Sequence, residues 1–195
     1  MSKEKFITLK TTAVPLAAEN VDTDQIIPAR FLKATTREGF GNNLFRDWRY
    51  DGQDNPIKDF VLNNPRFSGK VLVAGKNFGC GSSREHAAWA LYDYGFRVVM
   101  SSFFADIFKN NALNNGLLPI VVPDNFLKQT LGMVDENPNT EIVVNLENQT
   151  LRVGAIEQKF DINAYKKACL LNGYDDIDYL LSLEKKIRDF DLAHA

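Results

Sequence analysis

Ser82, Ser83 and Arg84 are the residues of this chain whose types and spacing best suit chemistry. They follow residues 75–81, which contain three glycines, and they precede a segment in which apolar residues recur every three or four positions until Gly95. This pattern predicts a tight turn and then a helix that Ser82 or Ser83 caps and Gly95 ends. Free backbone N–H groups and the positive end of the helix dipole meet at such a start, so it favours carboxylates and developing oxyanions.

Each of these polar side chains has a catalytic and a structural interpretation. The planar guanidinium of Arg84 suits bidentate binding of a carboxylate, and a positive field would stabilise the alkoxide of Ser82 so that it can act as a base. In the structural interpretation, Ser82 and Glu85 form a capping box and Arg84 is a solvated residue of the first turn. The residues alone leave both interpretations open.

The elements that must position these residues alternate between strands and helices. The short apolar run 71–74 predicts a strand before the turn, and residues 97–101 predict a second strand, parallel to the first. Residues 6–16 predict one or two short strands. The rest of the chain predicts a helix at 103–111, a strand at 116–122, a helix at 124–135, a hairpin of 141–146 with 150–153, a strand at 155–160, and helices at 163–171 and 176–190. The predicted fold class is therefore α/β.

Two carboxylates lie in the loop expected at residues 19–31. Asp22 and Asp24 flank Thr23, and Pro28 biases Ile27 towards an extended conformation. The pair could act as acid and base, cap a helix, form local turns or bind a hard metal ion. The sequence does not choose among these roles.

Residues of about 33–67 form a long segment rich in glycine, asparagine and aromatic residues. Phe45, Trp48 and Tyr50 lie near its centre. A connection of this length with weak periodicity predicts either a binding surface, such as a lid or a partner interface, or a satellite core under the loop.

Composition excludes several classes of protein. The chain has 195 residues, a net charge of −2 and no block of like charges, which argues against nucleic-acid binding and against a basic membrane-binding surface. No apolar run is long enough to cross a membrane and no signal peptide is visible, so we expect a single domain over residues 1–195 in the cytoplasm. Cys80 and Cys169 lie far apart, and His86 and His194 do not complete a metal site with them.

Other catalytic motifs fit poorly. Arg84 occupies the third glycine position of a dinucleotide-binding GxGxxG pattern, and neither Gly-Lys pair is followed by serine or threonine as a Walker A motif requires. Ser82 lacks the flanking glycines of a GxSxG nucleophile elbow. A Cys80 and His86 pair is possible in geometry, but a cysteine here more often fills space.

Two motifs carry a specific resemblance. The segment GCGSSREHAAWAL at 79–91 resembles the signature of the swivelling domain of the aconitase superfamily, and NVDTDQIIPARFL at 20–32 resembles that domain's opening motif. The chain length and the segments GFGNNLFRDWRY, FADIFKNNALNNGLLP and NGYDDIDYLL resemble the family of small subunits of bacterial isopropylmalate dehydratases. The likeness covers nearly the whole chain.

The resemblance implies a fold, a reaction and a partner. The fold is a three-layer β/β/α swivelling domain with a C-terminal helical tail at about 163–192. The reaction is that of a hydro-lyase of leucine biosynthesis, which interconverts 2-isopropylmalate and 3-isopropylmalate through isopropylmaleate. The active enzyme is a heterodimer or a higher hetero-oligomer with a large subunit that holds a [4Fe–4S] cluster, and this chain itself is expected to bind no cofactor. A related hydro-lyase acting on citraconate, methylmalate or dimethylmalate is the alternative.

The resemblance also implies roles for individual residues. Ser82 would remove the proton from carbon, Asp24 would support the site, and Ser83 and Arg84 would hold a substrate carboxylate. Phe31 and Leu32 would line the substrate's variable group. A further arginine is expected after the opening motif, and the sequence does not decide among Arg30, Arg37, Arg46 and Arg49.

Overall fold

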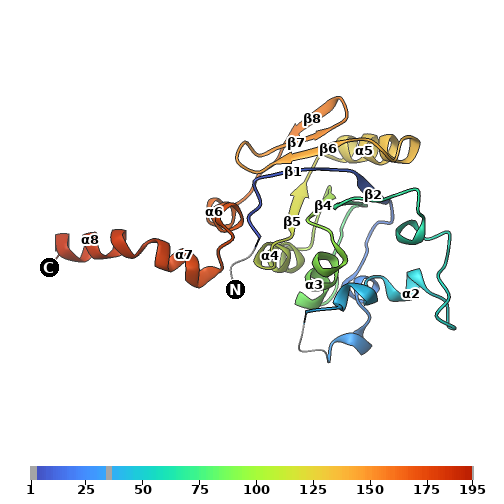
Figure 1. Ribbon diagram of the computed structural model, residues 1–195, viewed down its shortest axis with the longest axis horizontal. Coiled ribbons are helices and arrows are strands. Elements are labelled where there is room, and N and C mark those ends of the chain that lie inside the picture. Colours follow the sequence, from blue (N-terminus) through green and yellow to red (C-terminus); the bar gives the residue numbers. More distant parts are fainter. Residues whose placement is uncertain (1–3, 34–36, 195) are drawn as a thin grey trace.

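The computed structural model describes residues 4–33 and 37–194 and contains two four-stranded sheets stacked face to face (Figure 1). One sheet is parallel, with the order β2-β3-β4-β5, and the other is antiparallel, with the order β1-β6-β7-β8. The strands are β1 Thr8–Thr11, β2 Ala13–Leu16, β3 Val71–Ala74, β4 Val98–Ser101, β5 Leu118–Val121, β6 Ile142–Asn145, β7 Thr150–Val153 and β8 Ile156–Lys159. These strands confirm the predicted parallel core and the predicted hairpin.

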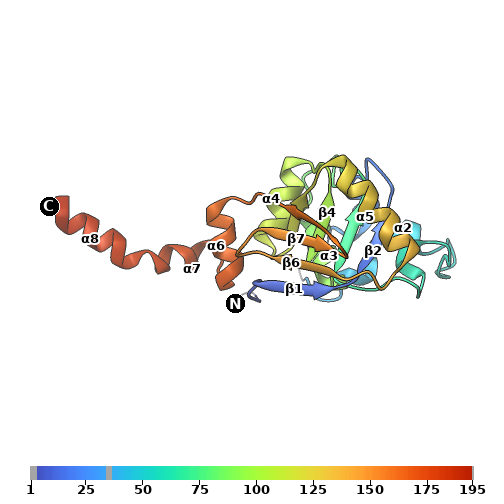
Figure 2. The same ribbon diagram turned by 90° about the horizontal axis from the view of Figure 1, so that it is seen from above.

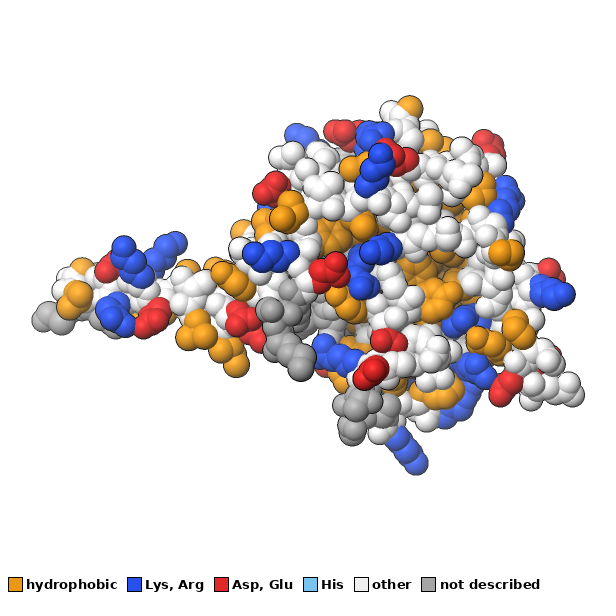
Figure 3. Space-filling view, viewed as in Figure 1, with side chains coloured by type: hydrophobic (Ala, Val, Ile, Leu, Met, Phe, Trp, Pro, Cys, Tyr) orange, Lys and Arg blue, Asp and Glu red, His pale blue; other side chains and the backbone are white. Residues whose placement is uncertain are grey.

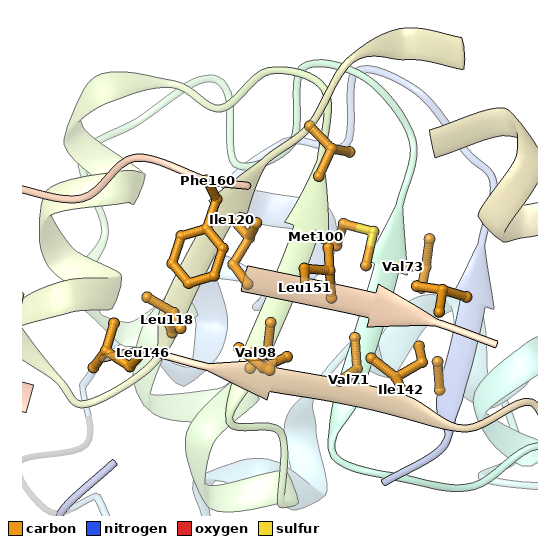
Figure 4. Packing of buried hydrophobic residues seen from close by; sticks show 14 of the residues in the cluster. Val71, Val73, Val98, Met100, Leu118, Ile120, Ile142, Leu146, Leu151 and Phe160 are labelled. Carbon is orange, nitrogen blue, oxygen red and sulfur yellow. The ribbon is translucent and has the colours of Figure 1, made fainter. Parts of the chain in front are cut away.

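The parallel sheet is the middle layer because both of its faces are apolar. In β3, Val71 and Val73 point to the antiparallel sheet, whereas Leu72 and Ala74 point to the helices on the other face. Successive side chains of a strand alternate between faces, so a strand buried on both sides is apolar at every position. Figure 4 shows the hydrophobic core between the two sheets, where side chains of both sheets meet.

Helices α3 (Glu85–Tyr94) and α4 (Asp106–Asn114) cover the other face of the parallel sheet. Helix α5 (Asp124–Glu136) packs against β2 and β3 and adds Phe126 and Leu127 to the core between the sheets. The arrangement is a three-layer β/β/α fold, as the resemblance implied. None of the helices in the described residues is both long and apolar enough to cross a membrane.

The connection from β2 to β3 contains short helices instead of one open loop. It holds α1 (Thr23–Ile26), α2 (Arg46–Arg49) and short 3-10 helices at Ala29–Phe31, Phe40–Asn43 and Val61–Asn63. Phe45 is fully buried, and Trp48 stacks on it with ring centroids 5.6 Å apart. This packing favours the satellite-core interpretation of the aromatic segment. Residues 34–36 of that segment lie outside the described residues.

The chain ends in an arm that leaves the body of the molecule (Figures 1 and 2). Helix α6 (Ala164–Asn172) ends at Gly173, as predicted, and is followed by α7 (Asp176–Ser182) and α8 (Glu184–His194). The single helix expected at 176–190 is thus wrong. The break follows Ser182, whose hydroxyl donates to the Tyr179 carbonyl at 2.6 Å, a contact that tends to bend helices. Figure 3 shows apolar, acidic and basic side chains interspersed along the visible face of the arm.

Candidate functional site

The candidate site lies at the carboxyl edge of the parallel sheet. Because β2, β3 and β4 run in the same direction, the loops that follow Leu16, Ala74 and Ser101 emerge at one edge, where ligands bind in open α/β sheets. The buried Ser101 hydroxyl donates to the Gly75 carbonyl at 2.7 Å and joins two of these loops.

Main-chain hydrogen bonds join the two motifs that carry the family resemblance. The Asn20 N–H donates to the Lys76 carbonyl at 2.8 Å, and the Gly79 N–H donates to the Val21 carbonyl at 2.7 Å. The opening motif therefore lies directly against the glycine turn, although more than fifty residues separate them in sequence.

Two glycines of the turn have backbone conformations that other residues adopt with strain. Gly79 has φ +76°, and a Cβ added there would lie 2.2 Å from Cγ of the buried Phe108. Gly81 has φ +86° and directly precedes Ser82. These glycines are needed for the turn, as the sequence predicted.

Helix α3 begins at Glu85, so the predicted serine cap is wrong. Arg84 is the N-cap residue and makes no side-chain capping bond. The Ser82 carbonyl accepts hydrogen bonds from the Thr23 hydroxyl at 3.0 Å and from the Arg84 N–H at 2.9 Å, and it is turned away from the helical direction. Residues 82–84 therefore turn tightly before the helix, and Arg84 itself has an extended backbone conformation.

Glu85 also differs from the predicted capping box. Its carboxylate accepts hydrogen bonds from the side chains of Asn115 at 2.9 Å and Trp89 at 3.2 Å. Glu85 is therefore held towards α4, away from Ser82. The helix still ends at Gly95, which has φ +118° as a left-handed C-cap, so that prediction is confirmed.

Ser82 and Ser83 are exposed at the mouth of the turn. Within the described residues, neither hydroxyl has a hydrogen-bond partner, and the N–H groups of Glu85 and His86 have no protein acceptor. The first turn of α3 thus presents free donors close to two free hydroxyls, which is the environment that the sequence predicted for a bound anion.

Arg84 and Asp24 form an ion pair that joins the two motifs. The side chain of Arg84 is largely buried, with 15% exposed, whereas that of Asp24 is 55% exposed. The hydrogen bond from Arg84, with its positive charge, holds the pKa of Asp24 below its ordinary value. The structure therefore brings together Asp24 and Arg84, two of the predicted site residues.

Phe31 and Leu32 lie just after α1, partly buried against the helix-side core. The guanidinium of Arg30 lies over the Phe31 ring, 4.7 Å from its centroid. These residues precede the undescribed positions 34–36. Within the described residues, no hydrogen bond joins Phe31 or Leu32 to Ser82.

The structure separates the four candidate arginines by their surroundings. Arg49 is buried, and its guanidinium donates to the Leu44 carbonyl at 3.3 Å and to other groups of the aromatic segment, so its role is structural. Arg30 pairs with Asp47 and Arg46 pairs with Asp54 on the surface.

Arg37 is the candidate that lies beside α3. Its guanidinium lies 4.8 Å from the Trp89 ring centroid and 3.6 Å from Glu85, the residue after Arg84. More than half of its side chain is exposed.

The remaining candidates have structural partners. Asp22 is the N-cap of α1 and forms a capping box with Gln25. Of the roles that the sequence left open for Asp22, the structure thus shows the helix cap. His86 packs against the ring of Trp89, with centroids 4.5 Å apart, and the Cys80 thiol donates to the Asn20 carbonyl at 3.4 Å. No group of three or more His, Cys, Asp or Glu side chains in the described part of the chain is placed to hold a metal ion.

Thr23 is a site residue that the sequence analysis missed. Its buried hydroxyl contacts the Ser82 carbonyl, 59 residues away. The only sequence signal is its position between two aspartates, which drew attention to the carboxylates instead.

Comparison with known proteins agrees with this arrangement. Residues 3–125 match the family described as the aconitase C-terminal domain. The chain is 63% identical to the 3-isopropylmalate dehydratase small subunit of Cytophaga hutchinsonii, over 96% of this chain and 94% of that protein. It is 62% identical to the small subunit of the same name from Azobacteroides pseudotrichonymphae, over 96% and 97%.

A solved structure extends the likeness to the fold. The crystal structure of 3-isopropylmalate dehydratase from Methanocaldococcus jannaschii superposes with a TM-score of 0.67, at 27% identity, over 95% of this chain and 99% of that chain. Together with the two joined motifs, these comparisons show that the chain belongs to the aconitase C-terminal domain family and, within it, to the small subunits of 3-isopropylmalate dehydratase.

Proposed function

We propose that this chain is the small subunit of a hydro-lyase that interconverts 2-isopropylmalate and 3-isopropylmalate through isopropylmaleate in leucine biosynthesis. The observation that carries the proposal is the ion pair of Arg84 with Asp24, which joins the two motifs two residues from the exposed Ser82. The names of the relatives at 63% and 62% identity favour isopropylmalate over citraconate, methylmalate or dimethylmalate.

In this proposal, the first task of the site is to bind a carboxylate. Arg84 and the Ser83 hydroxyl would hold one carboxylate of the substrate at the start of α3, where the N–H groups of Glu85 and His86 add to the positive field. The Asp24 ion pair keeps the Arg84 side chain in place before substrate arrives. Little conformational freedom is then lost on binding.

The second task is proton transfer. The Ser82 hydroxyl, as its alkoxide, would take the proton from the carbon next to the bound carboxylate, and it would return a proton to carbon in the reverse direction. A free hydroxyl is too weak an acid to ionise readily, so the positive charge of Arg84 and the free N–H groups must stabilise the anion. Asp24 remains ionised and acts through Arg84.

Departure of hydroxide requires a group that this chain does not provide. The two cysteines lie apart, and the described residues offer no ligand set for an iron–sulfur cluster. We place the expected [4Fe–4S] cluster in the large subunit and assign to this chain carboxylate binding and proton transfer. The open position of Ser82 suits a site that the large subunit completes.

We assign the second carboxylate contact to Arg37. Its guanidinium stacks on Trp89 and forms a long ion pair with Glu85, both residues of α3. Arg49, in contrast, is held in the aromatic segment, and Arg30 and Arg46 form closer ion pairs with aspartates of the same segment. Stacking on Trp89 orients the Arg37 guanidinium, and its ion pair with Glu85, at 3.6 Å, is longer than a hydrogen bond and leaves N–H donors for a substrate. Phe31 and Leu32 remain the proposed lining for the isopropyl group.

A reconstitution experiment tests the proposed function. The chain is mixed anaerobically with the cluster-bearing large subunit, and formation of the unsaturated acid is followed from 3-isopropylmalate, citramalate and dimethylmalate. We expect the highest kcat/KM with 3-isopropylmalate. A higher kcat/KM with another malate would contradict the substrate assignment, and no turnover of any of them would contradict the proposed reaction. The cytoplasmic location expected from the sequence stays a prediction.

A further inference from the structure

Thr23 makes two hydrogen bonds that bracket Gly81. Its N–H donates to the Cys80 carbonyl at 3.0 Å, and its hydroxyl donates to the Ser82 carbonyl at 3.0 Å. Thr23 is 1% exposed, so water does not compete for these groups. One buried residue of α1 therefore binds the peptide group before Gly81 and the peptide group after Ser82.

These two hydrogen bonds lie on either side of Gly81, where the backbone is intrinsically most flexible. Glycine has the widest conformational freedom of any residue, and Gly81 has φ +86° with 3.4 Å to the nearest side-chain atom from its hypothetical Cβ. An added Cβ would therefore reach only ordinary contact distance, so packing is looser at Gly81 than at Gly79. Hydrogen bonds therefore hold the backbone of Ser82 in position.

The hydroxyl of Thr23 is not needed to fill the buried space at this position. Valine has nearly the same shape and would fill the same buried position without a polar atom. Without the Thr23 hydroxyl, the Ser82 carbonyl would keep one described bond, from the Arg84 N–H two residues later. Such a short-range bond constrains the orientation of the loop relative to α1 much less.

Helix α1 thus controls both halves of the proposed chemistry. Thr23 holds the backbone of Ser82, and the next residue, Asp24, holds the side chain of Arg84. The first contact fixes the base and the second fixes the carboxylate clamp. Because Thr23 and Asp24 are consecutive residues of α1, one short helix holds both the base and the clamp.

We propose that Thr23 is a positioning residue, whose buried hydroxyl fixes the Ser82 peptide so that the Ser82 side chain is aligned with the carboxylate held by Arg84. The inference rests on the proposed function, because it assumes that Ser82 transfers the proton. Misplacement of a catalytic group by about 1 Å can lower a rate by roughly 100-fold. Loss of the Thr23 hydroxyl should therefore lower kcat more than it raises KM.

The test uses Thr23→Val in the complex with the large subunit, with 3-isopropylmalate as substrate. We expect kcat to fall by about 10- to 100-fold, with KM changed by less than about threefold since Arg84 and Asp24 are retained. Thr23→Ser keeps the donor and should restore kcat to within about threefold of the wild type. The matched control is Thr140→Val, which removes another buried hydroxyl that donates to main-chain carbonyls, those of Asn137 and Met133, away from the site.

The outcomes separate this inference from the proposed function. An inactive wild-type complex contradicts the proposed function, whereas an active wild-type complex with an unchanged kcat in Thr23→Val overturns only the role of Thr23. If Thr23→Val does not assemble, Thr23→Ser and Thr23→Ala replace it, because both lack the γ-methyl and only Ala lacks the hydroxyl. Equal kcat values for that pair would overturn the inference, and a lower kcat for Ala would support it.

Discussion

At the scale of single residues, the ion pair of Asp24 and Arg84 joins segments that are distant in sequence. Arg84 is largely buried and Asp24 is more than half exposed, so the pair lies at the boundary between protein and solvent. A surface pair of this kind contributes little to stability, and its importance is that it orients Arg84.

The pKa of Asp24 should depend on Arg84. The hydrogen bond and charge of Arg84 lower the pKa of this carboxyl, so the stability from the pair is present above the pKa of the unfolded chain. That stability is lost as pH falls through the folded-state pKa. In a carbon-13 NMR titration, Arg84→Gln should raise the pKa of Asp24 towards its ordinary value. An unchanged pKa would show that Arg84 does not hold the carboxylate in solution.

Arg37 and Arg49 should respond differently to the same substitution. Arg37→Gln should leave the free energy of unfolding within about 0.5 kcal/mol and raise KM by roughly 10-fold or more, since a charged hydrogen bond to substrate is lost. Arg49→Gln should lower the free energy of unfolding by about 1 to 3 kcal/mol, because the carbonyl of the buried Leu44 loses its donor.

Urea denaturation measures the free energy of unfolding of the Arg37 and Arg49 variants, and steady-state kinetics of their complexes with the large subunit measures KM. The reverse pattern, a destabilised Arg37 variant and a raised KM for the Arg49 variant, would contradict the assignment of the second carboxylate contact.

The site residues were partly predictable from sequence. Ser82 and Arg84 stood out because they follow a glycine turn, but their conformation depends on Thr23, which is 59 residues away. A local pattern cannot show that a distant hydroxyl takes the Ser82 carbonyl out of the helix. Local sequence also could not distinguish the exposed Arg37 from the buried Arg49, because their surroundings are formed by the fold.

At the scale of elements, the glycine turn is held against α4 by a close contact. Gly79 is the point of contact, because its Cα approaches the ring of Phe108, itself buried at 2% exposure. The sequence predicted that glycines are required here but could not identify what they approach.

Gly79→Ala should destabilise the protein strongly. The added Cβ would lie 2.2 Å from Phe108 at a positive φ, so we expect a loss of about 2 to 4 kcal/mol from overpacking and backbone strain together. Gly52→Ala is the control, because nothing lies within 4 Å of its hypothetical Cβ, and it should change stability by less than about 0.5 kcal/mol. Equal unfolding midpoints for the two variants would contradict this packing.

Strand positions were the most predictable elements. The β-branched runs at β3 and β4 identified buried strands, because a strand covered on both faces is apolar throughout. Helix starts were less predictable, as α3 shows, since capping depends on tertiary contacts. The aromatic segment had no clear period because its short helices pack individually on the core.

At the scale of the whole molecule, the C-terminal arm differs from the body. Among the described residues of α7 and α8, six large apolar side chains are at least half exposed, namely Ile177, Leu180, Leu181, Ile187, Phe190 and Leu192. Helix α8 follows α7 after Leu183, and Figure 2 shows both helices extending away from the two sheets. The body owes its stability to the cores on the two faces of the parallel sheet.

Deletion of residues 183–195 should therefore leave the body folded. We expect the Tm to change by less than about 3 °C, which corresponds to roughly 1 kcal/mol for a chain of this length. Calorimetry of the isolated chain measures this directly. A Tm lowered by about 10 °C would mean that α8 packs against the body in solution.

The central claim is that this chain contributes the base of a shared active site through Ser82. The most direct test is the kcat of Ser82→Ala in the assembled complex with 3-isopropylmalate, with Ser68→Ala, another exposed serine, as the control. We predict that kcat falls by about 10²- to 10⁴-fold in Ser82→Ala and is unchanged in Ser68→Ala. A Ser82→Ala complex that turns over within about threefold of the wild type would contradict the claim.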